Sequence, residues 1–383
     1  MTTTTNNEQK KLNVPNLRFP EFQGEWHSFL INEICSEFKS GKNIKADSIS
    51  ENGEYPVFGG NGLRGYTASY NHEGLYVLIG RQGALCGNVR SVNGKTYITE
   101  HAIAAAGNEK SNTSFLHYLF LKMNLGQYSD QSAQPGLAVN KLLKLKVSLP
   151  PISEQKKIAK LLSLLDDRIT TQNKIIKDLK KLKSAIINYA INSLDTDFAK
   201  FSSLYEMAGE GGTPTTSNAS FYDNGKIPFI KIDDLKQKYL TENKDFITEL
   251  GLQKSSTWLV PTHSILFSNG ATIGEISITT YPVCTKQGIL GIVPKQNIDV
   301  EYLYYFMSSS YFKKAVSRIV TEGTMKTAYL KDINNILCPI PTKKEQQEIA
   351  KIPSALNSKI DTERSILNLL ITQKQHLLHQ MFI

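Results

Sequence analysis

Two segments of the chain share one hydrophobic pattern, and this pattern predicts two long helices. Residues 150–191 and 341–382 align without a gap at an offset of 191 residues. In both segments apolar residues recur at alternating steps of four and three, the heptad pattern of helices that pack along one another. The first seam consists of Ile158, Leu162, Leu165, Ile169, Ile176, Leu179, Ile186 and Ala190. The second consists of Ile349, Leu356, Ile360, Leu367, Leu370, Leu377 and Met381.

Polar residues interrupt the two seams at the same two places, Gln172 and Lys183 in the first and Glu363 and Lys374 in the second. A long seam needs a partner, and the other copy is the most economical one, so we expect an antiparallel pair. Two core helices of separate domains are the alternative. Several flanking residues widen the apolar face and suggest that helices of another protein also pack here: Leu161, Leu164, Ile175, Leu182 and Ile187.

The start of the second helix carries two opposing signals. Thr342 and Glu345 form a Ser/Thr-x-x-Glu capping box that favours a helix start. Pro353 stands where Leu162 stands in the first copy. Because proline lacks the backbone N–H, we expect the second helix to start late or to kink there.

The segments before the two helices repeat a second plan. Strands are predicted at 55–58 and 75–80, separated by glycine-rich turns, and a helix at 113–125. Residues 268–274 align with 81–87 at an offset of 187. We predict a mixed α/β fold in which two similar globular domains are joined by two long α-helices forming an antiparallel coiled coil with a pseudo-twofold repeat. The expected boundaries are 1–24 for a tail and lead-in, 25–150 for the first domain, 151–195 for the central helix, 196–340 for the second domain and 341–383 for the C-terminal helix.

Composition and charge narrow the function. The chain has 44 Lys and Arg against 35 Asp and Glu, a net charge of +9, which favours a polyanionic partner. It has no apolar run long enough to span a membrane and no signal-peptide pattern, and the first eleven residues read as a disordered tail. The four cysteines lie far apart, which suits reduced thiols in the cytoplasm and disfavours a metal site. His376 and His379 read as exposed helix residues.

The chain offers little for catalysis. Residues 58–62 match F-x-G-x-G, a pattern of S-adenosylmethionine-dependent methyltransferases, so a self-contained DNA adenine methyltransferase is one alternative. The Asn/Asp-Pro-Pro-aromatic tetrapeptide that such an enzyme needs is missing, and there is no phosphate loop for ATP. The paired carboxylates at 166–167 and 233–234 lack a nuclease arrangement and read as solvated charge. We expect no catalytic residue in this chain.

Five stretches of three kinds carry a resemblance to a known family. They are the lead-in at 15–22, the entries to the two helices at 149–159 and 339–350, and the glycine turns at 59–62 and 79–87. Together with the order domain, helix, domain, helix, they make the chain resemble the specificity subunit of a type I restriction-modification system. The resemblance implies that it is not an enzyme and has no cofactor of its own. Two modification subunits would bring S-adenosylmethionine, two restriction subunits would bring ATP and Mg²⁺, and the target would be double-stranded DNA with a bipartite sequence and a fixed gap.

A DNA reader of this kind needs fork-shaped, amide or cationic side chains on its loops. The predicted DNA contacts are Asn61, Arg64, Arg81 and Gln82 in the first domain and Lys231, Asn269, Lys286, Gln287 and Lys326 in the second. Thr324 and Tyr329 are further candidates for holding phosphates. About 33 residues of helix, at about 1.5 Å each, would separate two half-sites by roughly 50 Å, or about 15 base pairs. The basic face of the first helix could follow DNA, dock a partner or face solvent. A structural adaptor that reads no bases is the third hypothesis.

Overall fold

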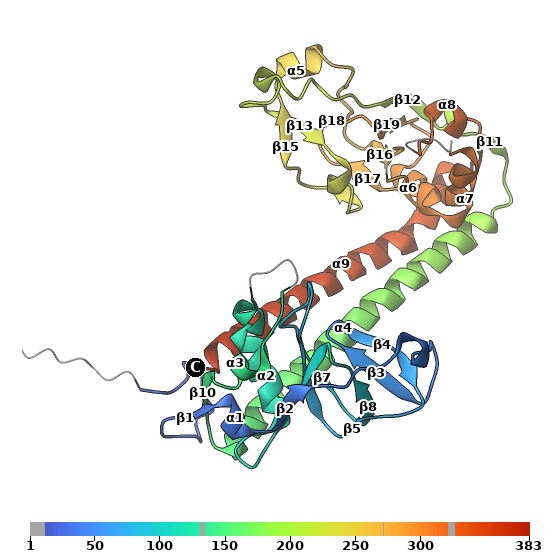
Figure 1. Ribbon diagram of the computed structural model, residues 1–383. Coiled ribbons are helices and arrows are strands. Elements are labelled where there is room, and N and C mark those ends of the chain that lie inside the picture. The colour runs from blue at the N-terminus through green and yellow to red at the C-terminus, as the bar shows by residue number, and fades with distance from the viewer. Residues whose placement is uncertain (1–11, 131–134, 271, 321–325) are drawn as a thin grey trace, which may run out of the picture. The chain divides into compact units, whose positions relative to one another are not determined.

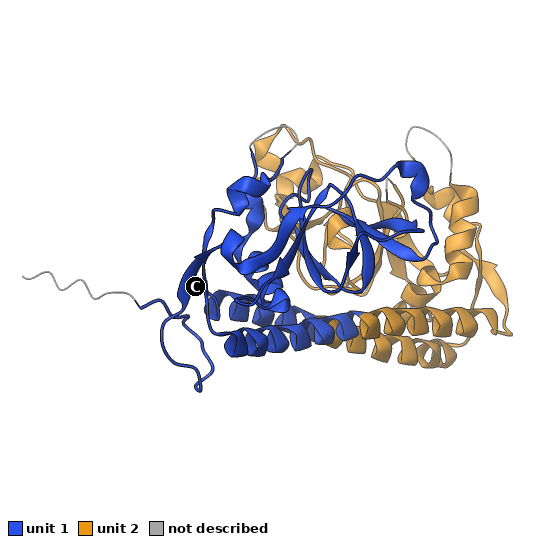
Figure 2. Ribbon diagram, turned by 60° about the horizontal axis from the view of Figure 1, so that its bottom comes forward, with its two compact units in different colours: residues 1–173, 365–383 blue, residues 174–364 orange. Residues whose placement is uncertain are grey.

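The computed structural model describes residues 12–130, 135–270, 272–320 and 326–383, so the predicted disordered tail lies outside the described residues. The chain divides into two compact units, coloured separately in Figure 2. Unit 1 contains residues 1–173 and 365–383, and unit 2 contains residues 174–364. Each unit therefore combines one globular domain with one stretch of each long helix. None of the described helices is long and apolar enough to cross a membrane.

The two long helices are α4 (Ile152–Asn192) and α9 (Lys343–Gln380), and they begin at equivalent positions of the repeat (Figure 1). The predicted late start of the second helix is wrong, because α9 begins at Lys343 and continues through Pro353. Its capping box is formed: the Thr342 N–H donates to Glu345 Oε2 at 2.8 Å, and the Glu345 N–H donates to Thr342 Oγ1 at 3.4 Å. Proline removes one backbone donor, and the buried packing of its ring offsets that loss.

Within each unit the two helices run antiparallel. In unit 1, Ile158 and Leu162 from the start of α4 share a core with Leu377 and Met381 from the end of α9. In unit 2, residues from the end of α4 share a core with Ala350 from the start of α9. The predicted pairing is therefore confirmed inside each unit.

The predicted seam needs one correction near the end of α4. The buried residues there are Ile187 and Ile191, whereas Ile186 and Ala190 are only partly buried. A straight helix has 3.6 residues per turn, so a strict heptad stripe drifts around it, and after several turns the neighbouring residue faces the core. Ile187 packs in the core of the second domain. This explains why the heptad pattern placed it among the flanking residues that widen the apolar face.

The first domain contains two four-stranded sheets, with strand orders β2-β9-β6-β7 and β4-β3-β8-β5, and a two-stranded sheet β1-β10. Its strands are β1 (His27–Leu30), β2 (Cys35–Ser40), β3 (Tyr55–Gly59), β4 (Gly62–Thr67), β5 (His72–Glu73), β6 (Tyr76–Gly80), β7 (Val89–Val92), β8 (Lys95–Ile98), β9 (Ala102–Gly107) and β10 (Lys146–Leu149). Its helices are α1 (Ile31–Ile34), α2 (Thr113–Met123) and α3 (Val139–Leu142). The strands at 55–58 and 75–80 and the helix from Thr113 are as predicted.

The second domain has a five-stranded sheet β12-β19-β16-β17-β14, a three-stranded sheet β15-β13-β18 and the pair β11-β20. Its strands are β11 (Phe198–Lys200), β12 (Tyr205–Glu210), β13 (Ile227–Ile230), β14 (Tyr239–Leu240), β15 (Asp245–Ile247), β16 (Ile265–Ser268), β17 (Ile276–Thr279), β18 (Cys284–Thr285), β19 (Ile289–Pro294) and β20 (Leu337–Pro339). Its helices are α5 (Glu249–Gln253), α6 (Val300–Ser308), α7 (Ser310–Ile319) and α8 (Leu330–Ile333).

Strand pairing confirms that the two domains repeat one plan and corrects the alignment of one loop. Gly80, the last residue of β6, pairs with Ala102, and Ser268, the last residue of β16, pairs with Ile289. Ser268 is thus the equivalent of Gly80, not of Arg81, and Arg81 corresponds to Asn269. At the far end of the loop the offset of 187 holds. Gly87 donates its N–H to the carbonyl of Gly80, and Gly274, 187 residues later, donates its N–H to the carbonyl of Ser268. The two loops differ by one residue, which an alignment without gaps missed.

One buried glutamine per unit ties the start of each long helix to its domain. Gln155 is fully buried: its Oε1 accepts the Asn112 N–H at 2.8 Å, and its Nε2 donates to the carbonyls of Lys110 and Pro150. Gln346 makes the same three contacts in unit 2, with Asp299, Asn297 and Pro341. Asn112 and Asp299 cap α2 and α6. The repeated Glu-Gln pair therefore marks the joint between domain and helix.

The lead-in of unit 1 packs against the start of α4 and the end of α9. Arg18 makes two hydrogen bonds of 2.8 Å to the two carboxylate oxygens of Glu154, which is fully buried. Trp26 packs edge-on against Phe115 and Phe382. These contacts hold the first domain on its helix ends.

Candidate nucleic-acid interface

In the first domain the predicted DNA contacts gather where two parallel strands end. Strands β3 and β8 are parallel, with Phe58 opposite Ile98, so the residues after them lie at one edge of the sheet. The turn after β3 carries Asn61, and Arg64 follows on β4. The loop after β6 carries Gln82, and its neighbour Arg81 donates its N–H to the carbonyl of His101 at 2.9 Å. The segment after β8 therefore lies against the segment after β6.

These loops enclose a surface cavity of about 430 Å³. It is lined by Gly59, Gly60, Asn61, Arg64, Gln82, Gly83 and His101. Asn61, Arg64 and Gln82 are exposed, as a DNA contact requires. Three of the four predicted residues of the first domain thus share one cavity. The fourth, Arg81, is half-buried beside it, with its carbonyl accepting the Leu137 N–H.

Two glycines of the β3–β4 turn shape the cavity. A Cβ on Gly60 would lie 2.7 Å from the carbonyl oxygen of His101, so only glycine lets the turn approach that segment. Gly62 has a φ of +109°, and a Cβ there would lie 2.2 Å from Arg90 Nη1. The guanidinium of Arg90 therefore packs against the turn, with Nη2 3.5 Å from the carbonyl of Asn61. These contacts give the turn a fixed shape and place a positive charge behind it.

The second domain repeats this arrangement with different side chains. Strands β13 and β18 are parallel, with Ile230 opposite Thr285, so Lys231 and Lys286 follow two adjacent strand ends. The Lys286 N–H donates to the carbonyl of Ile230 at 2.9 Å. Gln287 is exposed next to Lys286. Lys231 Nζ lies 2.7 Å from Asp245 Oδ1, an exposed ion pair that a phosphate could replace at little cost.

Asn269 does not face solvent, unlike the other predicted contacts of the second domain. Its side chain is fully buried, and its Nδ2 donates to the carbonyl of Ala328 at 3.2 Å. This amide holds the segment before α8 against the strand end, so in this conformation it has no face for a base. The sequence pattern could not show this, because the shift of one residue placed Asn269 in a more exposed position of the loop.

The segment held by Asn269 carries the remaining candidates. Lys326 and Tyr329 are exposed on either side of Ala328, near the ends of β16 and β18. Lys331 Nζ lies 5.5 Å from the centre of the Tyr329 ring, which adds positive charge to this edge. Thr324 lies outside the described residues. Lysines on this edge suit phosphate contacts, which position a protein on DNA without reading its sequence.

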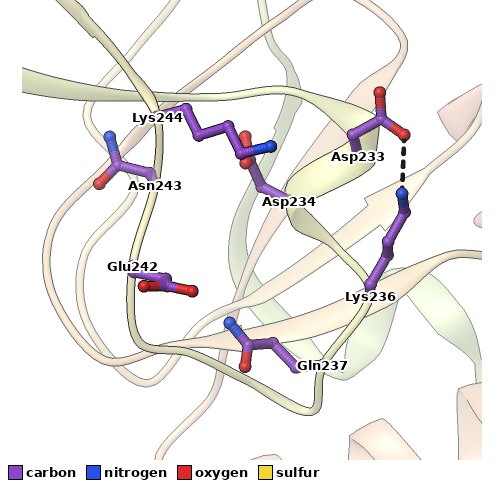
Figure 3. A pocket seen from close by; sticks show the side chains of 7 residues that line it. All are labelled: Asp233, Asp234, Lys236, Gln237, Glu242, Asn243 and Lys244. Carbon is purple, nitrogen blue, oxygen red and sulfur yellow. Dashed lines mark ion pairs between the residues drawn. The ribbon is translucent and has the colours of Figure 1, made fainter. Parts of the chain in front are cut away.

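The second domain also has a surface hollow that, unlike these loops, is lined by several carboxylates. It has a volume of about 420 Å³ and is lined by the residues drawn in Figure 3. Lys236 reaches toward Asp233, with 3.1 Å between Nζ and Oδ1, while Asp234 and Glu242 border the same space. Asp234 also accepts the Lys231 N–H at 2.9 Å. Three carboxylates repel phosphate, so this hollow does not suit the DNA backbone. Two of them, Asp233 and Asp234, are engaged with neighbouring groups.

The F-x-G-x-G segment does not have the geometry of a methyl-donor site. Gly59 pairs with Gly62 across a tight turn, and the chain returns as the antiparallel strand β4. A donor-binding turn of that pattern ends a strand and opens a helix, whereas this turn opens none. In the described ranges, no group of three or more His, Cys, Asp or Glu side chains is placed to hold a metal ion.

Sequence reasoning missed two residues of this site. Arg90 and His101 are far from the glycine turn in sequence and enter the site through strand pairing. The signal that could have found His101 is the parallel pairing of β3 and β8, because it brings the two following loops together. That pairing depends on a crossover that a periodicity analysis does not resolve.

Comparisons with known proteins agree with this architecture. A sequence profile described as "Type I restriction modification DNA specificity domain" matches residues 23–181 and 196–371. The chain is 39% identical over 183 residues to the EcoprrI specificity subunit of Escherichia coli, covering 47% of this chain and 44% of that protein. It therefore spans less than half of that relative. It is 24% identical over 367 residues to a putative type I restriction enzyme specificity subunit of Haemophilus influenzae, covering 92% of each.

Solved structures show the same fold at low sequence identity. The S subunit of a type I restriction-modification system from M. genitalium superposes with a TM-score of 0.66 at 18% identity, over 97% of this chain and 99% of that one. A chain from a structure concerned with complex assembly of the type I restriction-modification system superposes with a TM-score of 0.61 at 15% identity. These likenesses show the fold of the whole chain: two domains and two long helices.

Proposed function

This chain belongs to the type I restriction-modification DNA specificity family, and we propose that it is a sequence-specific DNA-binding specificity subunit. It would read a bipartite target, with one half-site for each domain, and direct methylation and restriction by partner subunits. The observation that carries the proposal is the repeat of one loop arrangement in the two domains. In each, two parallel strands end beside a third strand, and their loops present different polar and cationic side chains.

The difference between the two sets of loops supports two separate half-sites. The first domain offers Arg64 and Gln82, a fork and an amide that can make paired hydrogen bonds to a base edge. The second offers Lys231, Lys286 and Gln287. The same scaffold with different loop chemistry suits the same task on different sequences. Both domains belong to one molecule, so binding of the first half-site raises the effective concentration at the second.

The helices support a fixed gap between the half-sites. Helix α4 has 41 residues and α9 has 38, more than the roughly 33 residues taken above as the separation of the half-sites. At about 1.5 Å per residue, each is roughly 60 Å long. A helix pair of that length is suited to keep two DNA-reading loops at a set number of base pairs. It would decide how far apart the half-sites are read, while the loops decide which bases they contain.

Exposed apolar residues on the helices support docking of partner subunits. Ile175, Leu182 and Tyr189 recur at heptad spacing on α4 and are all exposed. Tyr189 borders an apolar hollow of about 570 Å³ that also includes Ile186, Ile349 and Ile352. An exposed apolar stripe of this kind on a helix is typical of a surface covered by another helix. We propose that two modification subunits dock on the helices, followed by two restriction subunits.

The chain would catalyse nothing by itself and would carry no cofactor. S-adenosylmethionine would bind the modification subunits, and ATP and Mg²⁺ the restriction subunits. The turn at 58–62, which offered the alternative of a self-contained methyltransferase, is a hairpin. No described loop therefore favours that alternative.

The decisive experiment is to map methylated bases in DNA exposed to this chain together with the modification subunits of its own system. We expect a bipartite motif with adenine methylated on both strands. Arg64→Ala should relax one half-site and Lys286→Ala should weaken only the other, since each lies in a different domain. Lys144→Ala and Lys314→Ala, at exposed positions outside these loops, are the matched charge controls. Methylation by the purified chain alone would contradict the proposal.

A further inference from the structure

Three side chains at the rim of the first domain's cavity form a hydrogen-bonded row. Glu100 and His101 follow β8, and Gln82 follows β6. The Nε2 of His101 lies 3.2 Å from Glu100 Oε1, and its Nδ1 lies 3.2 Å from Gln82 Oε1. Gln82 and His101 both line the cavity, whereas Glu100 is not one of its lining residues. The ring therefore links a carboxylate to the amide that we propose reads a base.

The chemistry of Glu100 fixes one proton of the ring. An ionised carboxylate accepts hydrogen bonds and donates none. The Nε2 of His101, which faces it, therefore carries a hydrogen in both the neutral and the charged ring. The second ring nitrogen, Nδ1, carries a hydrogen only in the charged ring, so Nδ1 is the ring nitrogen that can either donate to or accept from Gln82.

The state of Nδ1 decides how the Gln82 amide is turned. When Nδ1 carries a hydrogen, it donates to Gln82 Oε1, and the amide NH₂ is directed away from the ring. When Nδ1 is bare, it accepts from the amide NH₂, and Oε1 is directed away. The two ends of an amide have nearly the same shape, so the hydrogen-bond network decides its orientation.

We infer that His101, held by Glu100, is a positioning residue that selects which amide atom of Gln82 faces a base. It thereby sets the base that the first domain prefers at one position of its half-site. This inference rests on the proposed function, since it assigns the base chemistry of that site. An NH₂ group directed outward can donate to an acceptor, such as N7 or O6 of guanine. An outward Oε1 seeks a donor, such as N4 of cytosine or N6 of adenine.

The other charged and titratable groups near His101 come from three segments. Arg64 on β4 lines the same cavity, and Arg90 on β7 packs against the β3–β4 turn. Arg81 donates its backbone N–H to the His101 carbonyl, and Cys86 in the same loop lies with Sγ 3.3 Å from the Arg81 carbonyl. Among the described residues, Glu100 and Gln82 are the side chains with a hydrogen bond or ion pair to the ring of His101. The proton on Nδ1 therefore acts on Gln82 directly.

The second domain provides an internal control. The loop position of His101 is occupied there by Gly288, whose carbonyl accepts the Asn269 N–H as the His101 carbonyl accepts the Arg81 N–H. No side chain at that position can turn a neighbouring amide. The base preference of the second half-site should therefore not depend on a ring at this place.

The test selects duplexes from a random library with the complex of this chain and its modification subunits, at about pH 5.5 and about pH 8. We expect the preference at one position of the first half-site to shift roughly tenfold, from an acceptor edge at low pH to a donor edge at high pH. The second half-site should stay unchanged. An unchanged first half-site would overturn the inference, although bipartite binding itself would remain. Binding without any sequence preference would instead overturn the proposed function.

Two variants test the roles of the row. Glu100→Gln can donate to Nε2, so the neutral ring can keep its hydrogen on Nδ1. The low-pH preference should then persist at high pH. His101→Phe keeps a ring without hydrogen bonds, so the first half-site should lose its pH shift and become less selective at that position. Retained selectivity at the second half-site shows that each variant is folded. A pH shift that survives in His101→Phe would assign it to another group and overturn the inference.

Discussion

The Nζ of Lys374 lies 2.5 Å from Oδ1 of Asp166, and this contact has a counterpart in the other half of the repeat. In unit 2, the equivalent lysine, Lys183, donates to Oδ1 of Asn357 at 2.9 Å. Both lysines are polar interruptions of an apolar seam. These two lysines are therefore places where one long helix donates a hydrogen bond to the other, once in each unit. A half-buried polar pair of this kind favours one register, because a slip would leave the lysine without its acceptor.

We expect Asp166→Asn to destabilise unit 1 by about 1 to 2 kcal/mol, since the lysine loses a charged acceptor. Asp166 also accepts a hydrogen bond from the Tyr118 hydroxyl at 2.8 Å, so the substituted amide cannot serve both neighbours equally well. Thermal unfolding followed by tryptophan fluorescence can localise the effect. The chain has two tryptophans, Trp26 in unit 1 and Trp258 in unit 2. With Trp258→Phe as background, Trp26 reports unit 1, and an unchanged transition would refute this role of the pair.

The converse substitution, Asn357→Asp, should not stabilise unit 2, although it creates an ion pair with Lys183. Asn357 donates from Nδ2 to Asp361 Oδ2 at 3.0 Å, so its amide satisfies a donor and an acceptor at once. A carboxylate there would face Asp361 without a proton between them. We expect loss of up to about 1 kcal/mol, the cost of one hydrogen bond. The measurement is the Trp258 transition in a Trp26→Phe background, and a higher transition temperature would show that the lysine dominates.

His117 gives unit 1 a predicted sensitivity to acid. Burial lowers the pKa of His117 to about 4, and the positive charge of Lys374 lowers it further than Asp166 raises it. The unfolded chain therefore takes up this proton near pH 6.5, while the folded unit resists it until about pH 4. Stability is fully present above pH 6.5 and is lost as the pH falls toward 4, by up to about 3 kcal/mol. In His117→Phe this part of the pH dependence should vanish, as measured by Trp26 unfolding across that range, whereas the Trp258 transition should keep its own profile.

The helices and the domain repeat could be predicted because their signals are local. Heptad spacing fixed the two helices, and the match of Glu154-Gln155 with Glu345-Gln346 fixed their equivalence. The predicted late start of the second helix was wrong. The one backbone hydrogen bond lost at Pro353 costs less stability than the formed capping box and the buried helix face provide. The site was predicted only in part. Asn61 and Gln82 lie in glycine-marked loops and Arg64 lies on the strand that follows one, whereas His101 and Arg90 reach this site through strand pairing. Asn269 looked exposed until the strand register showed the shift of one residue.

The buried glutamines at the helix starts should control how firmly each domain sits on its helices. Gln155→Leu would leave the Asn112 N–H and two carbonyls without their partner in a buried place. We expect unit 1 to lose about 3 kcal/mol, within the usual cost of unsatisfied buried groups. Gln346→Leu should do the same to unit 2 and spare unit 1. Unfolding of the two single-tryptophan variants distinguishes these outcomes, and equal effects on both transitions would mean that the glutamines act through something other than their own domain.

The length of the helix pair should set the gap of the DNA target without changing its two halves. Adding one heptad to α4 near residue 173 and one to α9 near residue 364 keeps the apolar stripe in phase, because seven residues are close to two turns. The insertion lengthens each helix by about 10 Å, which corresponds to about three base pairs. Mapping of methylated sites should then show the same half-sites separated by a longer gap. An insertion of five residues in each helix is the matched control, since it adds similar length but rotates the stripe and should abolish activity. New half-site sequences after the heptad insertion would mean that the helices influence base reading itself, and that they do more than hold the two domains apart.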